Sequence, residues 1–326
     1  MSTKKLPIVI MTHTLPREWI SSLEGQCELF IGPTDATVLD TRLVEKLPQA
    51  DGLFTLLTIP VTITVLRMAP KLRVISNMAV GVDNIDVEAC TQRQIPVGNT
   101  PGVLTESTAD LSMSLLLSMA RNIPQASLDA RQGRWLTWSP AGWLGMELNH
   151  STLGIIGMGK IGKAVARRAM GFGIQVIFTD PQIQNETSAT QVSLDELLER
   201  SDIISLHAPL TPETRGMINQ GSISKMKPTA ILINAARGPL VDTPALTAAL
   251  QEHKIGAAAL DVTDPEPLPA SHPLFNLPNC LIVPHIGSAT QQTRRRMAEL
   301  ACANLLAGLR GEPLPHCVNP EVYAPD

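Results

Sequence analysis

The stretch Thr152 to Met170, TLGIIGMGKIGKAVARRAM, decides the fold class of this chain. Its first part, Leu153–Ile156, is short and apolar, which predicts a buried strand. The pattern G-x-G-x-x-G follows at once, and Lys160 to Met170 has the alanine, arginine and lysine content of a helix. In this order the first glycine permits a tight turn, the second lets the backbone approach a pyrophosphate, and the third packs helix against strand. The stretch therefore predicts a dinucleotide-binding domain with the pyrophosphate at the helix N-terminus.

The strand expected after this helix carries the signal for the choice of cofactor. It reads GIQVIFTD and ends in Asp180, a natural acceptor of hydrogen bonds from ribose hydroxyls. Residues 181–186 contain no Arg or Lys that could meet the 2′-phosphate of NADPH, and a carboxylate would repel that phosphate. Lys160 and Arg167 are the cations that could bend toward it. We therefore expect NAD as the cofactor, with NADH preferred and NADP possible.

Length and composition narrow the class of protein. At 326 residues the chain is longer than a typical single domain, and with 44% hydrophobic and 17% charged residues it can bury complete cores. A net charge of −4 and a pI near 6.0 give no electrostatic reason to expect nucleic acid or an anionic membrane as a partner. No apolar stretch approaches the roughly 18–20 residues that span a bilayer. The five cysteines are scattered without a CxxC spacing, which favours free thiols in a reducing cytoplasm.

Two series of alternating strands and helices are predicted, one on each side of the segment NTPGVL (99–104). The first has strands at 8–11, 28–31, 52–56 and 72–76 and helical pieces at 39–47 and 87–93. The second has strands at 153–156, 174–179, 202–206, 229–233, 257–261 and 280–283. Long helices are expected at 105–122 and 289–309. Strands separated by helices imply parallel sheets that are covered on both faces.

The expected fold class is α/β, with two Rossmann-like domains, one flavodoxin-like and one doubly wound, and a deep cleft between them. The last helix follows the end of the cofactor sheet, so we expect it to pack back on the first domain. Residues 1–100 and 288–326 would then form the substrate-binding, catalytic domain, and residues 101–287 the NAD(P)-binding domain. The active site is expected in the cleft.

Three polar residues follow the carboxyl ends of strands predicted in the second series. Arg237 lies in LINAARGPLVD (232–242), Glu266 in ALDVTDPEPLP (259–269) and His285 in LIVPHIGSAT (281–290). Open α/β sheets bind ligands at this edge, so the three side chains would meet near the nicotinamide. Arg can hold a carboxylate and polarise a carbonyl, His can donate a proton to the developing alkoxide, and Glu can orient the imidazole and stabilise its charged form. Taken singly, each could be an ordinary surface or loop charge, but together they are the groups that reduce an α-keto acid.

The chain resembles the D-isomer-specific 2-hydroxyacid dehydrogenases, and among them the glyoxylate/hydroxypyruvate reductases. The motifs that carry the resemblance run nearly from end to end: VISNMAVGVDNID (74–86), GIIGMGKIGKAVARRA (154–169), LHAPLTPETRGMIN (206–219), LINAARGPLVD, DVTDPEPLP and PHIGSAT. The resemblance implies that Arg237, Glu266 and His285 are the catalytic residues. It also places the substrate-carboxylate loop on Ala79, Val80 and Gly81, whose N–H groups would assist Arg237.

The same resemblance implies a set of cofactor contacts. They are Thr108, Gly157, Gly159, Lys160, Ile161, Gly162, Asp180, His207, Thr214, Ala235, Arg237, Asp261, His285 and Gly287. His207 is then a wall of the cofactor groove rather than a second catalytic base. No metal is implied, and no cluster of His, Cys and carboxylate residues has ligand spacing.

Three of the four tryptophans, Trp135, Trp138 and Trp143, lie in GRWLTWSPAGWLG (133–145). Core packing is one explanation. The resemblance implies another, because glyoxylate/hydroxypyruvate reductases carry a similar W-x-P segment in a dimer-forming loop, where a tryptophan reaches the partner's active site. Trp138 is the candidate for this substrate-binding role. The helix at 105–121 and this loop would then form the contacts of a homodimer.

The expected function is the reversible reduction of glyoxylate or hydroxypyruvate to glycolate or D-glycerate by hydride transfer from a nicotinamide cofactor in the cytoplasm. A longer or branched 2-keto acid is the alternative substrate within this class. A non-enzymatic, NAD-sensing, corepressor-like protein is the alternative from another class, because the fold also serves that role. The intact set of Arg, Glu and His favours the enzyme, although a binding protein could keep those residues.

Overall fold

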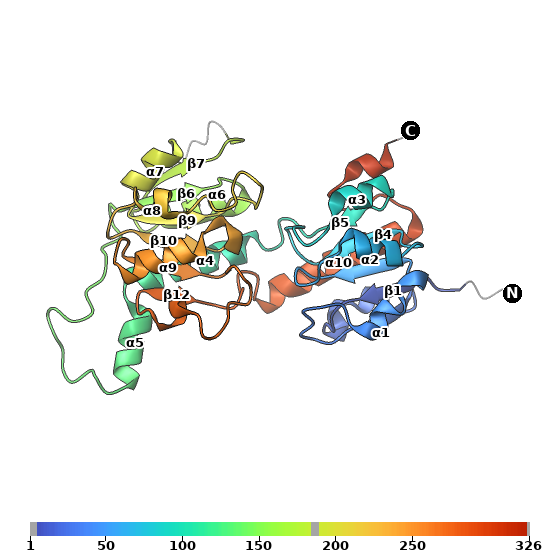
Figure 1. The fold of residues 1–326 in the computed structure, drawn as a ribbon, viewed down its shortest axis with the longest axis horizontal. Helices are drawn as coiled ribbons and strands as arrows, with labels where there is room; N and C mark the ends of the chain where they lie inside the picture. The colour runs from blue at the N-terminus through green and yellow to red at the C-terminus, as the bar shows by residue number, and fades with distance from the viewer. Residues whose placement is uncertain (1–4, 184–188, 325–326) are drawn as a thin grey trace. The chain divides into compact units, whose positions relative to one another are not determined.

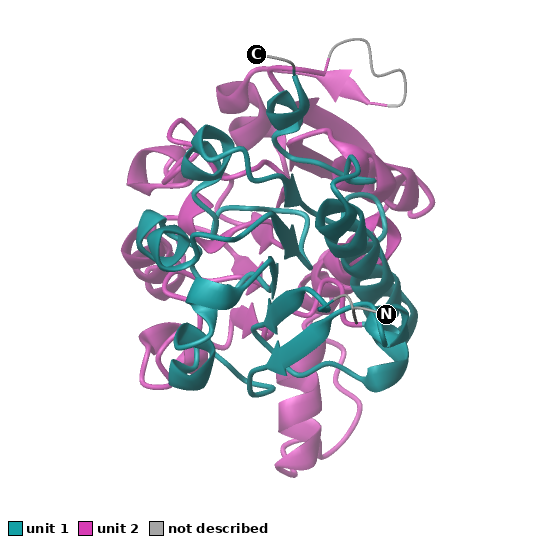
Figure 2. Cartoon of the chain, turned by 90° about the vertical axis from the view of Figure 1, so that its right-hand side faces the viewer, with its two compact units in different colours: residues 1–104, 290–326 teal, residues 105–289 magenta. Residues whose placement is uncertain are grey.

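The computed structural model describes residues 5–183 and 189–324, and the chain divides into two compact units. The first unit comprises Met1–Leu104 and Thr290–Asp326, and the second comprises Thr105–Ala289 (Figure 2). Each unit carries its own parallel sheet, with helices packed on it (Figure 1). Both units are therefore α/β, and the predicted fold class is confirmed.

The sheet of the first unit has the strand order of a flavodoxin-like fold. Its five parallel strands lie in the order β2-β1-β3-β4-β5. The bounds are β1 Ile8–Met11, β2 Glu28–Ile31, β3 Gly52–Thr55, β4 Val74–Asn77 and β5 Val97–Gly98. The central strands β1, β3 and β4 are buried along their whole length, because both faces of the sheet are covered.

One long helix and several short ones cover this sheet. They are α1 Thr41–Val44, α2 Ile63–Met68, α3 Val87–Gln92, α10 Gln291–Arg310 and the 3₁₀ helices η1 Arg17–Trp19, η2 Ser21–Leu23, η3 Leu47–Gln49 and η6 Pro320–Tyr323. The hydroxyl of Thr290 caps the N-terminus of α10, and Gly311 ends it in the left-handed conformation, with a φ of 75°. α10 packs on β3 and β4 through an apolar face that includes Ala301 and Leu305. The C-terminal helix thus completes the core of the N-terminal sheet.

The sheet of the second unit is doubly wound. Its seven parallel strands lie in the order β12-β11-β10-β9-β6-β7-β8. The bounds are β6 Thr152–Ile156, β7 Gln175–Thr179, β8 Thr190–Gln191, β9 Ile203–Leu206, β10 Ile231–Asn234, β11 Ala257–Leu260 and β12 Cys280–Ile282. The order of the strands reverses between β6 and β9, and the carboxyl ends of such a pair are where open sheets bind ligands.

The helices of the second unit cover both faces of its sheet. They are α4 Thr105–Ala120, α5 Ile123–Arg131, α6 Lys160–Met170, α7 Leu194–Arg200, α8 Gln220–Ile223, α9 Thr243–Gln251 and the 3₁₀ helices η4 Gly238–Leu240 and η5 Pro273–Asn276. α4 and α6 bury apolar side chains on one face, and α7, α8 and α9 do so on the other. α5 has no buried residue and stands apart from the rest of this unit (Figure 1). Along the described parts of the chain, no helix is long and apolar enough to cross a membrane.

Every predicted strand is present in the structure, within about two residues of its expected bounds. No range was predicted for the strands β5 and β8 or for the helices α2, α5, α7, α8 and α9. The two strands have two residues each, which is too short for a periodic pattern. The helix expected at 105–122 ends at Ala120, because Asn122 adopts a left-handed φ of 51° and α5 then begins at Ile123, with Pro124 in its first turn.

Candidate active site and cofactor-binding turn

The glycine turn joins β6 to α6 at the reversal point of the second sheet. Gly157 has a φ of 96°, in the region that favours glycine, and a Cβ there would lie 2.6 Å from the amide nitrogen of Ala208. A Cβ on Gly162 would lie 2.2 Å from the carbonyl oxygen of Gly157, so a hydrogen at this position lets α6 pack against the turn. A Cβ on Gly159 would meet nothing within 4 Å. Protein atoms therefore pack against the first and third glycines of the turn, whereas the space beside the second glycine is free of protein atoms.

The N-terminus of α6 fits the pyrophosphate of a dinucleotide. Its N-cap residue is Gly159, which has no side chain to accept hydrogen bonds from the N–H groups of the first turn. The helix is 11 residues long, so those N–H groups carry the positive end of a substantial macrodipole. Lys160, the first helical residue, is exposed beside them. Open space, uncapped N–H groups and a cation are what an anionic diphosphate requires.

Asp180 follows β7, and the backbone of two segments holds its carboxylate. Oδ2 accepts a hydrogen bond from the N–H of Met158, inside the glycine turn, at 2.8 Å. Oδ1 accepts from Gln182 at 2.8 Å and from Ile183 at 3.1 Å. A carboxylate has roughly four acceptor positions, so Oδ2 keeps room for about one further donor such as a ribose hydroxyl. Of the stretch 181–186, in which the sequence has no cation, residues 184–186 lie outside the described residues.

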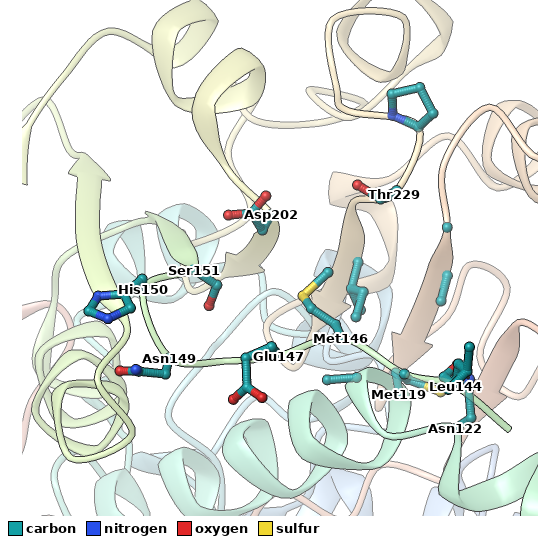
Figure 3. Close-up of a pocket in the computed structure, with 16 residues that line it drawn as sticks. Met119, Asn122, Leu144, Met146, Glu147, Asn149, His150, Ser151, Asp202 and Thr229 are labelled. Atoms are coloured by element: carbon teal, nitrogen blue, oxygen red, sulfur yellow. The ribbon is translucent and has the colours of Figure 1, made fainter. Parts of the chain in front are cut away.

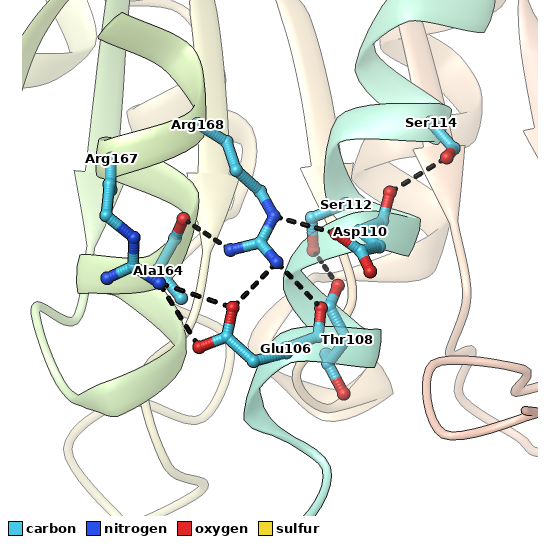
Figure 4. A network of polar contacts seen from close by, with 8 residues as sticks. All are labelled: Glu106, Thr108, Asp110, Ser112, Ser114, Ala164, Arg167 and Arg168. Carbon is cyan, nitrogen blue, oxygen red and sulfur yellow. Dashed lines mark hydrogen bonds and ion pairs between the residues drawn. The ribbon is translucent and has the colours of Figure 1, made fainter. Parts of the chain in front are cut away.

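Arg167, one of the two cations considered for a 2′-phosphate, is engaged elsewhere. Its Nη2 donates to both carboxylate oxygens of Glu106, at 3.1 and 3.2 Å. The neighbouring Arg168 binds Glu106 and Asp110, so the two arginines tie α6 to the first turns of α4 (Figure 4). Of the two cations, Lys160 has no ion pair among the described residues, whereas Arg167 is paired with Glu106.

Arg237, Glu266 and His285 follow three strands that are neighbours in the sheet. β10, β11 and β12 pair in this order and run parallel, so their carboxyl ends share one edge. Arg237 comes just after β10, Glu266 lies in the loop after β11, and His285 comes just after β12. The sheet thus brings the segments that carry these residues to one edge of the second unit.

The side chains of His285 and Glu266 are hydrogen-bonded to each other at this edge. Nδ1 of the imidazole and Oε1 of the carboxylate are 2.6 Å apart. An ionised carboxylate can only accept, so Nδ1 carries the hydrogen and Nε2 is the ring nitrogen left for a substrate. The two side chains keep 30% and 35% of their surface exposed, which leaves them accessible. This geometry suits an acid–base group that a carboxylate orients.

Asp261 holds the backbone that presents His285. Its carboxylate is buried and accepts hydrogen bonds from the N–H groups of Ile286 at 2.6 Å and Gly287 at 2.9 Å, while its carbonyl accepts from the N–H of His285 at 2.9 Å. His285 itself has a φ of 52°, an uncommon conformation for a residue with a side chain. Burial raises the pKa of Asp261, although the two N–H groups favour its ionised form.

A buried asparagine shapes the turn that carries Arg237. Nδ2 of Asn234 donates to the carbonyl of Arg237 at 2.8 Å, and its Oδ1 accepts from the N–H of Ala236 at 3.1 Å. A Cβ on Gly238 would lie 1.9 Å from the carbonyl oxygen of Thr263, so the glycine lets the turn pack on the segment that leads to Glu266. The Arg237 side chain is half-buried.

His207 follows β9 directly and lies beside the glycine turn, where its N–H donates to the carbonyl of Ile156 at 2.7 Å. Its Nε2 is 2.8 Å from the hydroxyl of Ser205, and its Nδ1 is buried without a partner in the described structure. Burial lowers the pKa of His207 to about 4, so the ring is neutral near pH 7. A neutral ring does not supply a proton, which fits a place in the wall of the groove.

The remaining residues predicted to contact the cofactor occupy the same unit. Thr108 in α4 is buried, and its hydroxyl donates to the carbonyl of Gly287 at 3.4 Å. Thr214 uses its hydroxyl within its own loop, donating to the carbonyl of Pro209 at 2.7 Å. Ala235 follows β10 directly, and Ile161 packs against the core from the first turn of α6.

The residues predicted to bind the substrate carboxylate, Ala79–Gly81, belong to the first unit. They follow β4 at the carboxyl end of its sheet. Ala79 is buried, whereas Val80 keeps 37% of its surface exposed.

The tryptophan-rich segment lies on the surface of the second unit. Trp135 and Trp138 are 65% and 80% exposed, so core packing does not explain them. Trp143 is half-buried, and its Nε1 donates to the carboxylate of Asp129 at 2.8 Å.

A cavity of about 620 Å³ opens at the opposite edge of the second sheet (Figure 3). It is lined by Met119 at the end of α4, by the segment before β6, and by residues such as Asp202 and Thr229 that precede strands. Parallel sheets bind ligands at their carboxyl ends, and this cavity is at the amino ends, so it is not part of the site above. Within the described residues, no group of three or more His, Cys, Asp or Glu side chains is placed to hold a metal ion.

A glycine turn that fits a dinucleotide and an oriented His on the same sheet are the equipment of a nicotinamide-dependent oxidoreductase. Residues 113–287 match the family model for the NAD-binding domain of D-isomer specific 2-hydroxyacid dehydrogenases. The chain is 44% identical to a glyoxylate reductase of Korarchaeum cryptofilum, an alignment that covers 97% of each chain.

Solved structures agree with this match. One of a protein from Thermus thermophilus superposes with a TM-score of 0.90 at 45% identity, covering 95% of this chain and 99% of that one. An NADPH-dependent glyoxylate/hydroxypyruvate reductase of Sinorhizobium meliloti, in complex with NADP and malonate, superposes with a TM-score of 0.85 at 30% identity, covering 98% and 99%. The chain belongs to the D-isomer specific 2-hydroxyacid dehydrogenase family, as the resemblance predicted.

Proposed function

We propose that this protein is an NAD(P)-dependent reductase of glyoxylate and hydroxypyruvate, producing glycolate and D-glycerate, and that the reaction is reversible. The observation that carries this proposal is the His285–Glu266 pair, 2.6 Å apart, at the sheet edge shared with Arg237. The substrate class is supported by the relatives, which are a glyoxylate reductase and a glyoxylate/hydroxypyruvate reductase.

The proposed roles follow from the chemistry of each side chain. The reduced nicotinamide, when bound, supplies a hydride to the carbonyl carbon of the 2-keto acid. His285 donates the proton on Nε2 to the carbonyl oxygen as it becomes a hydroxyl, and Glu266 keeps the ring oriented and favours its protonated form. Arg237 binds the carboxylate of the substrate with its planar, bidentate fork and polarises the carbonyl.

The remaining contacts would hold the cofactor at the carboxyl edge of the sheet. We propose that the N–H groups at the start of α6 bind the pyrophosphate, with Lys160 beside them. Asp180 would accept a hydrogen bond from the ribose. Its position beside the turn is supported by its bonds to three backbone N–H groups, and a carboxylate fixed there disfavours the phosphate of NADPH. We therefore propose that NADH is preferred.

A homodimer is the assembly we propose. The arm, residues 123–145, comprises α5 and the segment that follows it, and large apolar side chains along it are exposed: Ile123, Leu128, Trp135, Leu136, Trp138 and Leu144. An apolar surface of this kind marks an interface more readily than a solvated loop. The arm is also closed at its base, where the N–H of Met146 donates to the carbonyl of Ala120 at 2.7 Å. We propose that it packs on a second copy and that Trp138 contributes to that copy's active site.

We further propose that the protein acts in the cytoplasm. The support is that all five cysteines are free thiols, as expected in a reducing compartment.

A panel of 2-keto acids tests the proposed substrate class. Oxidation of NADH and NADPH would be followed at 340 nm with glyoxylate, hydroxypyruvate, pyruvate and a branched 2-keto acid, and the products identified by NMR. We expect the highest kcat/KM for glyoxylate or hydroxypyruvate, with glycolate or D-glycerate as the product. If kcat/KM is higher for the branched acid, that acid is the substrate in place of glyoxylate and hydroxypyruvate. If NADH and NADPH are not oxidised with any of the acids, the proposed function is wrong.

A further inference from the structure

The loop that carries Glu266, residues 262–268, comes after β11 and is held by little of its own backbone. Among the described residues, no N–H or carbonyl of this loop takes part in a backbone–backbone hydrogen bond. Pro265 and Pro267 flank Glu266 and have no N–H to donate. The orientation of Glu266 must therefore come from side chains that bind the loop.

Two threonine hydroxyls bind the carbonyls that precede Glu266. Oγ1 of Thr263 donates to the carbonyl of Pro265 at 2.8 Å. Oγ1 of Thr243 donates to the carbonyl of Asp264 at 2.9 Å. These carbonyls belong to the two successive peptide groups that lead to the backbone nitrogen of Glu266. Because a peptide group is planar and rigid, the two hydroxyls fix the direction in which the chain enters this residue.

The two threonines belong to parts of the unit that are themselves fixed. Thr263 is buried, and its carbonyl oxygen packs closely against Gly238, in the turn that carries Arg237. Thr243 is the first residue of α9, whose buried Leu246 belongs to the core of the second unit. The loop is therefore tied to the segments after β10 as well as to its own strand.

The carboxylate of Glu266 needs this support from its backbone. Its Oε1 lies 2.6 Å from Nδ1 of His285, and no other hydrogen bond to this carboxylate is made by the part of the chain that the structure describes. The side chain keeps 35% of its surface exposed, so water can compete for the carboxylate. A loop that moved would let the pair with His285 open.

We infer that Thr263 and Thr243 are positioning residues for the reaction: by holding the two peptide groups before Glu266, they keep its carboxylate on Nδ1 of His285. This inference rests on the proposed function, in which the imidazole donates the proton from Nε2. The threonines act through Glu266. Loss of a hydroxyl should therefore lower kcat, with less effect on KM, because the substrate carboxylate is bound by Arg237.

Thr263→Val tests the inference, because valine keeps the shape of the side chain and removes the hydroxyl. We expect kcat for glyoxylate reduction to fall about fivefold, which corresponds to about 1 kcal/mol, the contribution of one hydrogen bond. The KM for glyoxylate and the Kd of NADH should stay within about twofold of wild type. Thr263→Ser keeps the hydroxyl and should restore kcat. Thr243→Val changes a half-buried side chain and should lower kcat about threefold, because its carbonyl lies one peptide further from Glu266.

NMR of the ring nitrogens, in protein labelled at histidine, gives a readout that does not depend on activity. It shows which nitrogen of His285 carries the hydrogen when the ring is neutral, and the variant His285→Gln assigns the signals. Because Glu266 accepts from Nδ1, wild type should show mainly the Nδ1–H tautomer. In Thr263→Val the ratio of the Nδ1–H to the Nε2–H tautomer should fall about fivefold, and in Thr263→Ser it should return to the wild-type value.

Thr247→Val is the matched control. Its hydroxyl also donates to a backbone carbonyl, that of Thr243 at 2.7 Å, but within α9. It should leave kcat and the tautomer ratio within about twofold of wild type. A double variant separates positioning from a general loss of structure. Added to Glu266→Ala, which has no carboxylate to position, Thr263→Val should lower kcat by less than about twofold, whereas a merely structural effect would again be about fivefold.

The outcomes separate the inference from the proposed function. An unchanged kcat and tautomer ratio in Thr263→Val, an equal change in Thr247→Val, or no recovery in Thr263→Ser would each overturn the inference. If wild type reduces none of the 2-keto acids but Thr263→Val still lowers the tautomer ratio about fivefold, the proposed function fails, and the conclusion that the threonines position Glu266 stands.

Discussion

Asp261→Asn perturbs the positioning of His285 without touching the imidazole or its partner Glu266. The carboxylate receives two backbone N–H groups, from Ile286 at 2.6 Å and from Gly287 at 2.9 Å. Asparagine keeps one acceptor oxygen and replaces the other with an NH₂ donor. One N–H of the loop then loses its acceptor and faces another donor.

The magnitude follows from the lost bond. A hydrogen bond to a charged group contributes about 1.5–3 kcal/mol, so the loop that carries His285 should be held about 2 kcal/mol less tightly. That corresponds to roughly a thirtyfold change in the population of the productive conformation, since 1.4 kcal/mol is about tenfold. We therefore expect kcat for glyoxylate reduction to fall by about one order of magnitude or slightly more.

Stability should respond much less than activity. Burial raises the pKa of Asp261, so ionising it costs more in the folded chain than in the unfolded chain. This cost is absent below the ordinary pKa of Asp and is fully present above the raised pKa. At pH 7 asparagine removes the cost while losing the bond, and the two effects offset. The melting temperature should shift by less than about 4 °C.

The pH dependence gives the same prediction a second readout. The two bonds need the ionised carboxylate, which is lost as the pH falls through the raised pKa of Asp261. In wild type, protonation of Asp261 should therefore lower kcat at a higher pH than protonation of an ordinary Asp would. In Asp261→Asn this contribution to the fall of kcat at acid pH should be absent.

The assay is NADH oxidation at 340 nm from pH 4.5 to 8, with the melting temperature and the Kd of NADH measured on the same samples. Asp242→Asn is the control, because Asp242 accepts the N–H of Ala245 at the start of α9 and Asn caps helices equally well. If kcat of Asp261→Asn stays within twofold of wild type, Asp261 does not position His285. If only the Kd of NADH rises, Asp261 is a cofactor contact and nothing more.

Four further changes test the other roles. Glu266→Gln should lower kcat for glyoxylate reduction, because an amide offers Nδ1 of His285 a single acceptor oxygen and no charge to hold the ring; an unchanged kcat argues against the pairing. Arg237→Lys keeps the charge but loses the planar fork, so the KM for glyoxylate should rise and kcat fall, and a native kcat/KM would exclude the carboxylate clamp. Wild type should have a higher kcat/KM with NADH than with NADPH, by about fivefold or more, and Asp180→Ser should narrow the gap; a wild-type preference for NADPH would contradict the role given to this carboxylate. Asp129→Ala removes the hydrogen-bond acceptor that Trp143, Arg134 and Gln125 share within the arm. The dissociation constant of the dimer, measured by analytical ultracentrifugation, should therefore rise on the order of tenfold. If wild type is a monomer, the proposed dimer is wrong.

The parts of this fold that the sequence could predict are those with local signals. The strand, glycine turn and helix at 152–170 follow from residue spacing alone, and the structure gives Gly157 and Gly162 separate steric reasons for being glycine. The adjacency of the segments that carry Arg237, Glu266 and His285 could be foreseen because parallel strands end at one edge. Short elements such as β5 carry no comparable pattern.

The parts that could not be predicted depend on side chains that bond to distant backbone. Nothing near Thr243 in the sequence indicates that its hydroxyl holds the carbonyl of Asp264, nor does the segment around Asp261 indicate that it binds the loop of His285. The engagement of Arg167 by Glu106 joins residues far apart in sequence and required the packing of α4 against α6. In each case, a polar or charged side chain found its partner only once the sheets had formed.

The most direct test of the account is the rate of glyoxylate reduction by His285→Ala, with NADH saturating and the Kd of NADH measured separately. We predict that wild type oxidises NADH with glyoxylate and that the variant loses on the order of 10²–10⁴ in kcat, the usual contribution of a positioned acid, while it still binds NADH. A variant that retains the wild-type rate would contradict the central role of the His285–Glu266 pair.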